Sequence, residues 1–573
     1  MSVENLVTDH IETWTTAQVP KKSGGRGRGK KTNGQTLYGI KKLRELILEL
    51  GVRGKLVPQE PKDEPAYELL KKIAKEKARL VKEGKIKKQK PLPEIGEDEK
   101  PYELPQGWAW SRLGRILDVQ DSIRVPINNA ERQSRIGPYP YYGANGQVGV
   151  IDDFLFEGER ILLAEDGGFF SDPIRGVSYI VNGKFWVNNH AHVMECLCGT
   201  AASFWTSYFN RMNWEPLVQG MTRAKLNQRT MLDIPLPTPP LDEQHRIVAK
   251  VDELMALCDK LEQEQTNNSE THQQLVKTLL DTLTNATDHE DFIESWQRIE
   301  GNFDILFTTP ESIDVLKQTV LQLAVMGKLV PQDPDDEPAS VLLERIADEK
   351  DRLVEEGKLK KQKPLPVIRE DEKLFELPDG WEWTRLIDYY DVRDGTHDSP
   401  KATPEGYPLI TSKNLYSGKL DFENVTYIST EDHLKIIERS NVNKGDILFA
   451  MIGSIGNPVI VDTEKAFSIK NVALFKYYSV PNSVPSFLLI YLQHSSSGMK
   501  AEATGAVQSF VSLGKLRSYI KAVPPLQEQH RIVAKVDELM AICDSLKDRL
   551  NDAQITQVQL ADAIVANAVD SHV

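Results

Sequence analysis

A long internal repeat constrains the fold of this chain more than any other feature of its sequence. Gly54-Lys-Leu-Val-Pro-Gln59 recurs as Gly327-Lys-Leu-Val-Pro-Gln332, and three further motifs between residues 63 and 110 recur at the same offset. A second block, residues 243–255, recurs without change at residues 528–540, at a slightly larger offset. The sequence therefore contains one frame twice, and the stretch between the two blocks is longer in the second copy.

The segments between the repeated blocks differ from each other. Residues 105–238 and 378–523 show little resemblance until their last turns, although the same motifs flank both. The chain of 573 residues is also too long for one domain, since domains usually contain about 100–200 residues. A duplicated frame that carries two unlike inserts indicates one scaffold that presents two different readers.

The repeated frame has the spacing of long amphipathic helices. Apolar side chains alternate at intervals of four and three residues in both copies of the second block, which is the heptad period of helices that wrap around each other. A core stripe without a helical partner is the alternative, but the stripe continues toward Leu283 with polar flanks, giving roughly 40 residues or about 60 Å of helix. We therefore predict a helix pair. Shorter amphipathic helices, each ended by a glycine, are predicted at residues 38–50 and 312–326. The stripe consists of Ile247, Val251, Leu254, Cys258 and Leu261 in the first copy and Ile532, Val536, Leu539, Cys543, Leu546 and Leu550 in the second.

The inserts have the pattern of β-rich domains. Short apolar or aromatic runs are separated by turn signals such as Asn182-Gly183. The runs are residues 161–164, 177–181, 446–451, 459–461 and 471–478. The predicted fold class is α+β: two β-rich domains joined by long helices, with an internal pseudo-two-fold repeat.

Composition and charge exclude several classes of protein. The chain is 40% hydrophobic, which rules out global disorder, and its net charge of −14 excludes a uniformly basic coat for nucleic acid. The four cysteines lack the spacing of a zinc site, and Cys196-x-Cys198 is interpreted as part of a strand, so no metal is expected. No apolar run approaches the length of a membrane span, and residues 1–10 lack an apolar signal core. We therefore expect a soluble, cytoplasmic protein.

The sequence lacks a recognisable catalytic constellation. Gly24-Gly-Arg-Gly-Arg-Gly-Lys30 has the spacing of a phosphate-binding loop, but Lys31 replaces the required Ser or Thr and no strand precedes the loop. A basic disordered tail is the preferred interpretation, and a tail that neutralises phosphates is the alternative. There is no Asp/Asn-Pro-Pro-Tyr tetrapeptide, no His-Glu-x-x-His motif and no nucleophile elbow. The chain is predicted to be non-catalytic.

Several motifs together resemble one protein family. Pro-Pro-Leu-x-Glu-Gln at residues 239–244 and 524–529, followed by the Arg-Ile-Val heptad helix, resembles the conserved regions of the specificity (S) subunits of type I restriction-modification systems. Gly-Lys-Leu-Val-Pro-Gln and Glu-Leu-Pro-x-Gly-Trp-x-Trp look like the longer members of that family. Asp394-Gly-Thr-His-Asp-Ser-Pro400 in the second insert and Tyr141-Tyr-Gly-Ala-Asn145 in the first look like two types of target recognition domain. The resemblance covers about residues 38–570.

The resemblance implies an organisation in six segments. The long conserved helices are expected to pair as an antiparallel coiled coil that joins the two target recognition domains. The segments are a basic disordered N-terminal tail (1–37), an N-terminal conserved helical region (38–104), target recognition domain 1 (105–238), a central conserved helical region (239–377), target recognition domain 2 (378–523) and a C-terminal conserved helix (524–573).

The resemblance also implies a function. Each recognition domain of a family member reads one half of a bipartite site in double-stranded DNA, and the helical frame sets the unread spacer. Two methyltransferase (M) subunits bind the frame with pseudo-two-fold symmetry, carry S-adenosylmethionine and flip the target adenine. Restriction/translocase (R) subunits use ATP and Mg. No cofactor is expected in this chain itself. A chain that cuts or methylates DNA by itself, and a scaffold or inhibitor without its own DNA target, are the two alternatives.

Side chains that read base edges are expected among the motifs of the two inserts, since Arg pairs with guanine, Asn or Gln with adenine, and Ser or Thr with either. The same motifs could instead hold the fold. At the offset of the second repeated block Arg223 corresponds to Gln508, so the two loops cannot make the same contact, and substitution of either should relax only one half of the site. The candidates are Tyr142, Asn145, Gln147, Asn188, Asn189, His190, Arg223 and Lys225 in the first insert, and Thr396, His397, Ser412, Lys413, Asn414, Ser454, Lys470 and Gln508 in the second.

A second candidate surface lies on the repeated helix and would bind the M subunits. Its residues are repeated although they need not lie on the heptad seam, and ordinary helix solubility is the alternative interpretation. Charge reversal at both arginines is expected to reduce co-purification of M. The candidates are Gln244, Arg246, Lys250, Gln529, Arg531 and Lys535. Each insert carries one more acidic than basic residue, so DNA binding without M is expected to be weak and dependent on salt.

Overall fold

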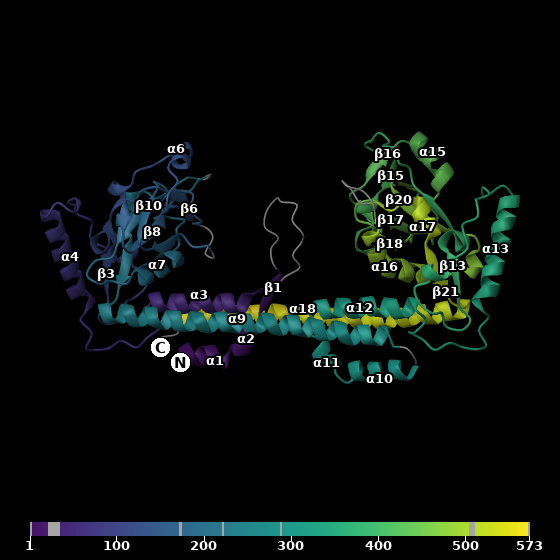
Figure 1. Ribbon diagram of the computed structural model, residues 1–573, viewed down its shortest axis with the longest axis horizontal. Helices are drawn as coiled ribbons and strands as arrows, with labels where there is room; N and C mark the ends of the chain where they lie inside the picture. Colours follow the sequence, from purple (N-terminus) through teal and green to yellow (C-terminus); the bar gives the residue numbers. More distant parts are fainter. Residues whose placement is uncertain are drawn as a thin grey trace. The chain divides into compact units, whose positions relative to one another are not determined.

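The computed structural model describes residues 3–20, 35–170, 175–220, 223–286, 289–503 and 510–570 (Figure 1). The chain divides into two compact units: unit 1 consists of Met1–Ser269 and Asp552–Val573, and unit 2 of Glu270–Asn551. Each unit contains a helical frame and one β-rich insert. Within the described ranges, no helix is both long and apolar enough to cross a membrane.

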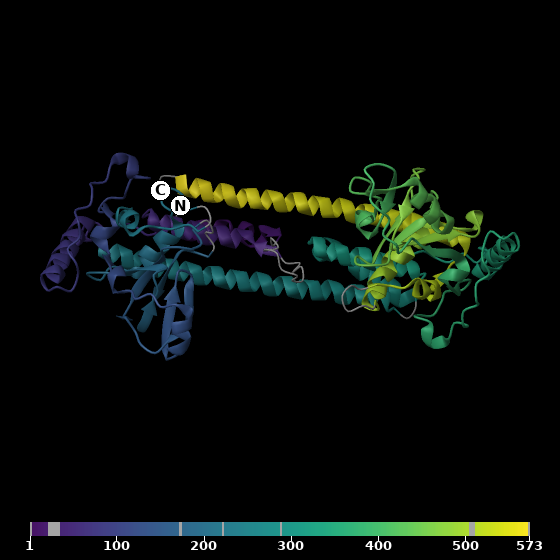
Figure 2. The same cartoon turned by 90° about the horizontal axis from the view of Figure 1, so that it is seen from above.

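The frame of unit 1 combines segments from the two ends of the chain. Figures 1 and 2 both show α3 alongside the first part of α9, and Arg44 of α3 pairs with Asp259 of α9 at 2.7 Å. Buried side chains of α3, α9 and the end of α18, among them Leu43, Ile247 and Ala561, belong to one core cluster. The elements are α1 (Val3–Asp9), α2 (Ile11–Thr16), β1 (Gln18–Pro20), β2 (Gln35–Leu37), α3 (Tyr38–Val52), α4 (Ala66–Lys82), α9 (Leu241–Thr284) up to residue 269, and α18 (Leu526–Asp570) from residue 552.

The frame of unit 2 has the same construction with the roles of the long helices exchanged. Here the start of α18 and the end of α9 enclose α12, and Ile532, Leu316 and Leu280 share one core cluster. Helices α9 and α18 contain 44 and 45 residues, so the predicted long helices are confirmed. Most residues of their seams are buried, whereas Val251, Leu539, Leu546 and Leu550 are partly buried. Their wrapping as an antiparallel coiled coil stays a prediction. The other frame helices are α10 (His289–Glu300), α11 (Phe303–Leu306), α12 (Pro310–Val325) and α13 (Ala339–Glu355).

The repeated motifs bind one another at the start of each long helix. In unit 1, Gln59 Nε2 donates to the Gly54 carbonyl at 2.6 Å and to Glu243 Oε1 at 3.2 Å, and Arg246 pairs with Asp63 at 2.6 Å. Glu243 is buried, and burial raises its pKa above the ordinary value. These motifs are therefore repeated together because they form one structural junction.

Unit 2 repeats this junction contact for contact. Gln332 donates to the Gly327 carbonyl at 2.7 Å and to Glu528 at 3.2 Å, and Arg531 pairs with Asp336 at 2.7 Å. In unit 2 the indole of Trp381, the first tryptophan of the Glu-Leu-Pro-x-Gly-Trp-x-Trp motif, also donates to Glu528 Oε2 at 3.0 Å.

The lysine of the Gly-Lys-Leu-Val-Pro-Gln motif caps a long helix. Lys55 Nζ donates to the Val569 carbonyl at 2.8 Å at the end of α18, and Lys328 Nζ donates to the Thr284 carbonyl at 2.9 Å at the end of α9. A cation suits these positions because the last carbonyls of a helix lack backbone partners. The preceding Gly54 has φ +68°, the left-handed conformation that commonly follows a helix end.

The structure contradicts two of the six residues predicted to bind the M subunits. Gln244 and Gln529 are fully buried at the start of the long helices, and the side chain of Gln244 also contacts the insert. Gln244 accepts from the Ala201 amide at 3.2 Å and donates to the Pro239 carbonyl at 3.1 Å, and Gln529 donates to the Pro524 carbonyl at 3.0 Å. A buried amide that holds the frame cannot form part of a docking surface.

The other four partner candidates are more accessible but already carry contacts within the chain. Arg246 and Arg531 hold the junction carboxylates described above, Lys250 pairs with Glu253 at 3.0 Å, and Lys535 pairs with Glu538 at 3.0 Å. A role of Arg246, Lys250, Arg531 and Lys535 in binding M stays a prediction. Charge reversal at either arginine would also break the junction, so that variant does not isolate partner binding.

The expectation of a disordered N-terminus is wrong for residues 3–20, which form α1, α2 and β1. Trp14 is fully buried in the core of unit 1, and Gln554 of α18 donates to the Thr16 carbonyl at 3.1 Å. Gly39 of α3 allows the backbone of Trp14 to approach α3 closely, because a Cβ at position 39 would lie 2.4 Å from the Trp14 carbonyl oxygen. Helices this short depend on tertiary burial rather than on propensity, so the sequence pattern did not indicate them. The basic run at residues 21–31 lies outside the described residues.

The insert of unit 1 contains two four-stranded sheets and is closed by the pair β3–β12. One sheet has the order β6-β5-β10-β7 and the other β4-β11-β8-β9. Its elements are β3 (Ala109–Arg112), α5 (Leu113–Ile116), β4 (Asp118–Val119), α6 (Asn129–Ser134), β5 (Tyr139–Gly143), β6 (Gly146–Ile151), β7 (Phe156–Glu157), β8 (Arg160–Ala164), β9 (Ser178–Val181), β10 (Lys184–Val187), β11 (Ala191–Glu195), α7 (Ala202–Arg211), α8 (Gln228–Leu232) and β12 (Pro235–Thr238).

The insert of unit 2 contains a four-stranded sheet, β14-β20-β17-β18, a three-stranded sheet, β16-β15-β19, and the closing pair β13–β21. The α+β class with two β-rich domains and long helices is confirmed. Its elements are β13 (Glu382–Arg385), α14 (Leu386–Tyr389), β14 (Tyr390–Asp394), β15 (Tyr407–Ile410), β16 (Thr426–Ile428), α15 (Thr430–Ser440), β17 (Ile447–Ala450), β18 (Gly456–Ile460), β19 (Ser468–Ile469), β20 (Val472–Tyr477), α16 (Pro485–Ala501), α17 (Leu513–Ser518) and β21 (Ile520–Val523).

The two inserts share one scaffold despite their unlike sequences. In each insert, the strand that follows a short helix (β4 after α5, β14 after α14) is the edge strand of a four-stranded sheet. The two sheets have the equivalent orders β4-β11-β8-β9 and β14-β20-β17-β18. The segments that precede α8 and α17 are also anchored alike: the Leu226 amide donates to the Glu165 carbonyl at 2.7 Å, and the Val511 amide donates to the Met451 carbonyl at 2.9 Å. Different side chains are therefore presented from equivalent backbone positions.

Candidate nucleic-acid interface

Three segments of the first insert meet at the end of strand β8. The Glu165 amide donates to the His190 carbonyl at 2.8 Å, and the Gly167 amide donates to the Ala224 carbonyl at 3.1 Å. Asp166 and Lys225 form an isolated β-bridge. Residues that are far apart in the sequence, 165–167, 188–190 and 223–226, are thereby placed together at one edge of the domain.

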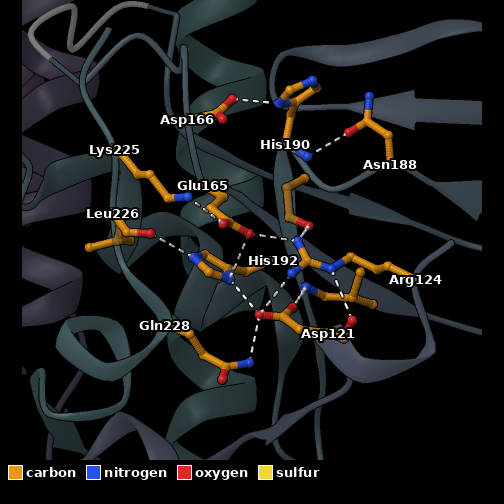
Figure 3. Close-up of polar contacts among 12 residues, drawn as sticks. Asp121, Arg124, Glu165, Asp166, Asn188, His190, His192, Lys225, Leu226 and Gln228 are labelled. Atoms are coloured by element: carbon orange, nitrogen blue, oxygen red, sulfur yellow. Dashed lines mark hydrogen bonds and ion pairs between the residues drawn. The ribbon is translucent and has the colours of Figure 1, made fainter. Parts of the chain in front are cut away.

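The outer layer of this meeting point consists of polar side chains, several of which Figure 3 shows. Asp166 Oδ1 contacts His190 Nδ1 at 2.6 Å and Arg223 Nη2 at 2.7 Å. Asn188 Oδ1 accepts from the His190 amide at 2.8 Å, and Asn145 Nδ2 donates to the Gly167 carbonyl at 3.0 Å. Four of the eight predicted residues of this insert therefore form one contiguous polar surface.

A buried layer supports the outer one (Figure 3). His192, which is fully buried, faces Asp121 Oδ2 at 2.6 Å through Nδ1 and the Leu226 carbonyl at 3.0 Å through Nε2. Arg124 donates to Glu165 Oε2 at 2.8 Å. Burial alone would raise the pKa of Asp121, but the hydrogen bond and charge of His192 and the charge of Arg124 outweigh burial and hold this pKa below its ordinary value.

The buried layer also contains a set of groups that could bind a metal ion. One ligand atom each from Asp121, Glu165 and His192 lies within 4.8 Å of the others. However, Arg124 and Lys225 already supply two positive charges to these carboxylates, with Lys225 Nζ 3.3 Å from Glu165 Oε1. The group is thus a charge-balanced network of ion pairs. Its contacts with Lys225 and with the Leu226 carbonyl hold the loop that carries Lys225 in place.

The remaining candidates of the first insert lie apart from this cluster or on its rim. Gln147 is exposed on β6, and its amide donates to the Gly149 carbonyl at 3.1 Å. Asn189 is exposed beside His190. Tyr142 is only partly exposed, and its ring packs edge-on against Phe185 with centroids 5.9 Å apart, so much of this side chain belongs to the core.

The second insert builds a comparable surface around Asp394 at the end of β14. Asp394 is buried, and its carboxylate pairs with His397 Nε2 at 2.9 Å and with the guanidinium of Arg439. His397 Nδ1 lies 2.9 Å from Asn471 Oδ1. Thr396 forms a β-bridge with Lys470, so the candidates Thr396, His397 and Lys470 are brought together.

One candidate of the second insert is placed inside a loop. Asn414 is buried; its Oδ1 accepts from the Thr411 amide at 2.9 Å, and its Nδ2 donates to the Asp421 carbonyl at 3.2 Å. This amide closes the loop and is not available to a base edge, so the prediction is corrected for Asn414. Ser412 is partly exposed and Lys413 is exposed on the same loop, Ser454 is exposed in the β17–β18 connection, and Gln508 lies outside the described residues.

Sequence reasoning missed the residues that support both surfaces: Asp121, Arg124, Glu165, Asp394 and Arg439. One signal in the sequence could have indicated Asp121 and Asp394. The two aspartates are separated by the same number of residues as Gly54 and Gly327 of the first repeated motif. Arg439 lies on α15, far from Asp394 in the sequence, so only the tertiary structure could reveal this contact.

A family model described as the type I restriction modification DNA specificity domain matches residues 105–270 and 378–556. This chain belongs to that family. It is 40% identical to the type I restriction enzyme EcoAI specificity subunit of Escherichia coli and 40% identical to the EcoEI specificity subunit, over the full length of both chains in each comparison. The EcoKI specificity subunit of Escherichia coli K12 is 22% identical over 81% of this chain and 89% of the relative.

Solved structures of the family also match this chain. The HsdS subunit from Thermoanaerobacter tengcongensis covers 83% of this chain at 16% identity, with a TM-score of 0.41 and 100% of its own length matched. A chain from a structure of complex assembly in a type I restriction-modification system covers 82% of this chain at 16% identity, with a TM-score of 0.45 and 99% of its own length matched.

Proposed function

We propose that this chain is the DNA-specificity subunit of a type I restriction-modification complex and that each insert reads one half of a bipartite DNA site. The observation that carries the proposal is the pair of unlike polar surfaces on one scaffold. Asp166, His190 and Arg223 occupy the end of β8 in one insert, whereas Asp394, His397 and Arg439 occupy the end of β14 in the other. Two polar surfaces that differ in side chains and in position on a shared scaffold suit two readers of different sequences.

The frame supports a role in spacing the two readers. Helices α9 and α18 contribute residues to both units, and at 1.5 Å per residue each is about 66 Å long. We propose that this length fixes the unread spacer. The duplicated junctions at Glu243 and Glu528 would offer two equivalent places near which M subunits bind with pseudo-two-fold symmetry.

The chain is proposed to be non-catalytic, with the chemistry in its partners. S-adenosylmethionine would be carried by the M subunits, and ATP and Mg would be used by the R subunits. The family membership and the full-length relatives named as specificity subunits favour this role over a scaffold or inhibitor without a DNA target. The polar clusters around Asp166 and Asp394 also suit a binding surface, because each carboxylate is already paired with an arginine.

Hydroxyl-radical footprinting of the complex with M tests this proposal. We expect two protected segments separated by a less protected spacer on a DNA that contains the target, and no specific protection when this chain is omitted. Raising the salt concentration should weaken the footprint strongly, since phosphate contacts release counterions. A single continuous protected segment, or equal protection of unrelated DNA, would contradict the bipartite reading.

A further inference from the structure

Each insert holds one exposed arginine against an enclosed carboxylate. The side chain of Arg223 is 57% exposed and that of its partner Asp166 is 18% exposed. The side chain of Arg439 is 60% exposed and that of Asp394 is 4% exposed. The carboxylates are fixed by the fold, whereas the guanidinium groups face solvent.

A histidine also contacts each carboxylate. His190 Nδ1 lies 2.6 Å from Asp166 Oδ1, and His397 Nε2 lies 2.9 Å from Asp394 Oδ2. Gly167 adds a further constraint, because it has φ +66° and a Cβ there would lie 3.2 Å from Arg223 Nε. A side chain at position 167 would therefore crowd the guanidinium of Arg223, whereas glycine leaves room for it.

Each carboxylate engages only part of its arginine. Asp166 and Asp394 both contact Nη2, and Arg223 Nη2 additionally lies 3.2 Å from His190 Nδ1. In the described parts of the chain, Nε and Nη1 of both arginines make no hydrogen bond with the protein. A guanidinium held through one hydrogen of Nη2 still offers the second Nη2 hydrogen together with Nη1 or Nε, and either pair can form a bidentate fork.

Stability alone does not account for these pairs. An exposed arginine contributes about 0–1 kcal/mol through a surface ion pair. Guanine presents two acceptors, O6 and N7, in the major groove, and a guanidinium fork matches both. The chemistry of the two sites therefore suits a guanine base edge in double-stranded DNA.

We propose that Arg223 and Arg439 each read one guanine, one in each half of the bipartite site, and that Asp166 and Asp394 position them. This inference rests on the proposed function. The two pairs occupy different places in the scaffold: Asp166 follows β8 and Asp394 ends β14. The two guanines are accordingly read from different positions within the two domains.

Methylation of a randomised DNA library by the complex of the full chain with M, followed by sequencing of the modified sites, tests the assignment. Arg223→Ala should reduce discrimination at one G·C pair of one half-site by about 5- to 150-fold and leave the other half unchanged. Arg439→Ala should do the same in the opposite half. Arg223→Lys should fail to restore the preference, because a lysine lacks the fork.

The positioning role of Asp166 is tested at the same base pair. Asp166→Asn should reduce the preference for guanine at the position that Arg223→Ala affects and at no other position. Arg115→Ala is the matched control: Arg115 is 43% exposed, pairs with Glu94 at 2.9 Å, and lies on α5, away from the Asp166 cluster. This variant should methylate the same motif as the wild type.

Different outcomes contradict the proposed function and the assignment of the two guanines. If the wild-type complex yields no bipartite motif, the proposed function itself fails. If the motif is bipartite but Arg223→Ala and Arg439→Ala leave every position unchanged, only the guanine assignment fails. Uniform weakening on all sequences would show phosphate contact and would also overturn it.

Discussion

Substitution of Ala561 by aspartate should lower the free energy of unfolding of unit 1 by about 3–5 kcal/mol, the range for an uncompensated buried charge. Ala561 is fully buried in the core cluster of unit 1, together with Ile564 of the same helix and residues of α3 and α9. The last turns of α18 thus complete a core that is otherwise built from residues before 270.

Leu560 provides the matched control for this prediction. It precedes Ala561 on α18 but is 44% exposed, so Leu560→Asp should change stability by no more than about 0.5 kcal/mol. Both variants place one negative charge at neighbouring positions of α18 and outside its last turn, so the helix dipole does not distinguish them. Hydrogen exchange should show loss of protection in α3 for Ala561→Asp only. Equal protection of α3 in the two variants would contradict the assignment of this helix end to unit 1.

Replacing Lys521 by methionine should stabilise unit 2 by about 2–4 kcal/mol at pH 7. Lys521 is fully buried on β21, and burial lowers its pKa to about 7 from the ordinary 10.5. At 1.36 kcal/mol per pKa unit this depression corresponds to at most about 5 kcal/mol. The rings of Tyr389, Tyr390 and Phe487 lie 4.7–4.9 Å from Nζ and offset part of the burial cost, and loss of the partner of the Tyr390 hydroxyl costs about 1–3 kcal/mol.

The effect of Lys521→Met on stability should depend on pH in a definite direction. Because the pKa of Lys521 is lower in the folded state, the unfolded chain binds more protons between about pH 7 and 10.5. The stability of the wild type therefore rises with pH across this window, and the advantage of Lys521→Met should shrink toward zero. Denaturant titrations of both proteins at several pH values measure this difference.

Unit 1 supplies a natural reference for the buried lysine. The strand pair β12–β3 corresponds to β21–β13, and Leu236 stands at the position of Lys521 when the second repeated blocks are aligned. Leu236→Met should leave the pH dependence unchanged. A difference between wild type and Lys521→Met that stays constant from pH 7 to 10 would show that the lysine does not titrate in this range.

The sequence predicted the helices because a heptad stripe is a local pattern, but it could not identify what covers the stripe. Ile247 and Leu254 recur at helical spacing, and both are buried. Their neighbours include Ala561, from the last turns of the final helix, which no local pattern connects to them. Repetition was the informative non-local signal: the motifs at Gln59, Asp63 and Glu243 recur together because they touch.

The candidate site was only partly predictable for the same reason. Asn188, His190 and Arg223 were accessible to reasoning from side-chain chemistry, since such residues read base edges. Asn414 has the same chemistry but is enclosed by its own loop, and burial cannot be read from residue type. Asp166 and Asp394, which contact the arginines, are acidic and were not expected on a surface proposed to bind a polyanion.

Single-molecule sequencing of methylated adenines tests the central proposal most directly. The DNA would come from cells that express this chain together with its M subunit, and from cells that express M alone. We expect a split motif with an unread central gap of constant length, present only when this chain is expressed. Methylation without a sequence motif, or a motif that persists in cells with M alone, would contradict the proposal that this chain supplies the specificity.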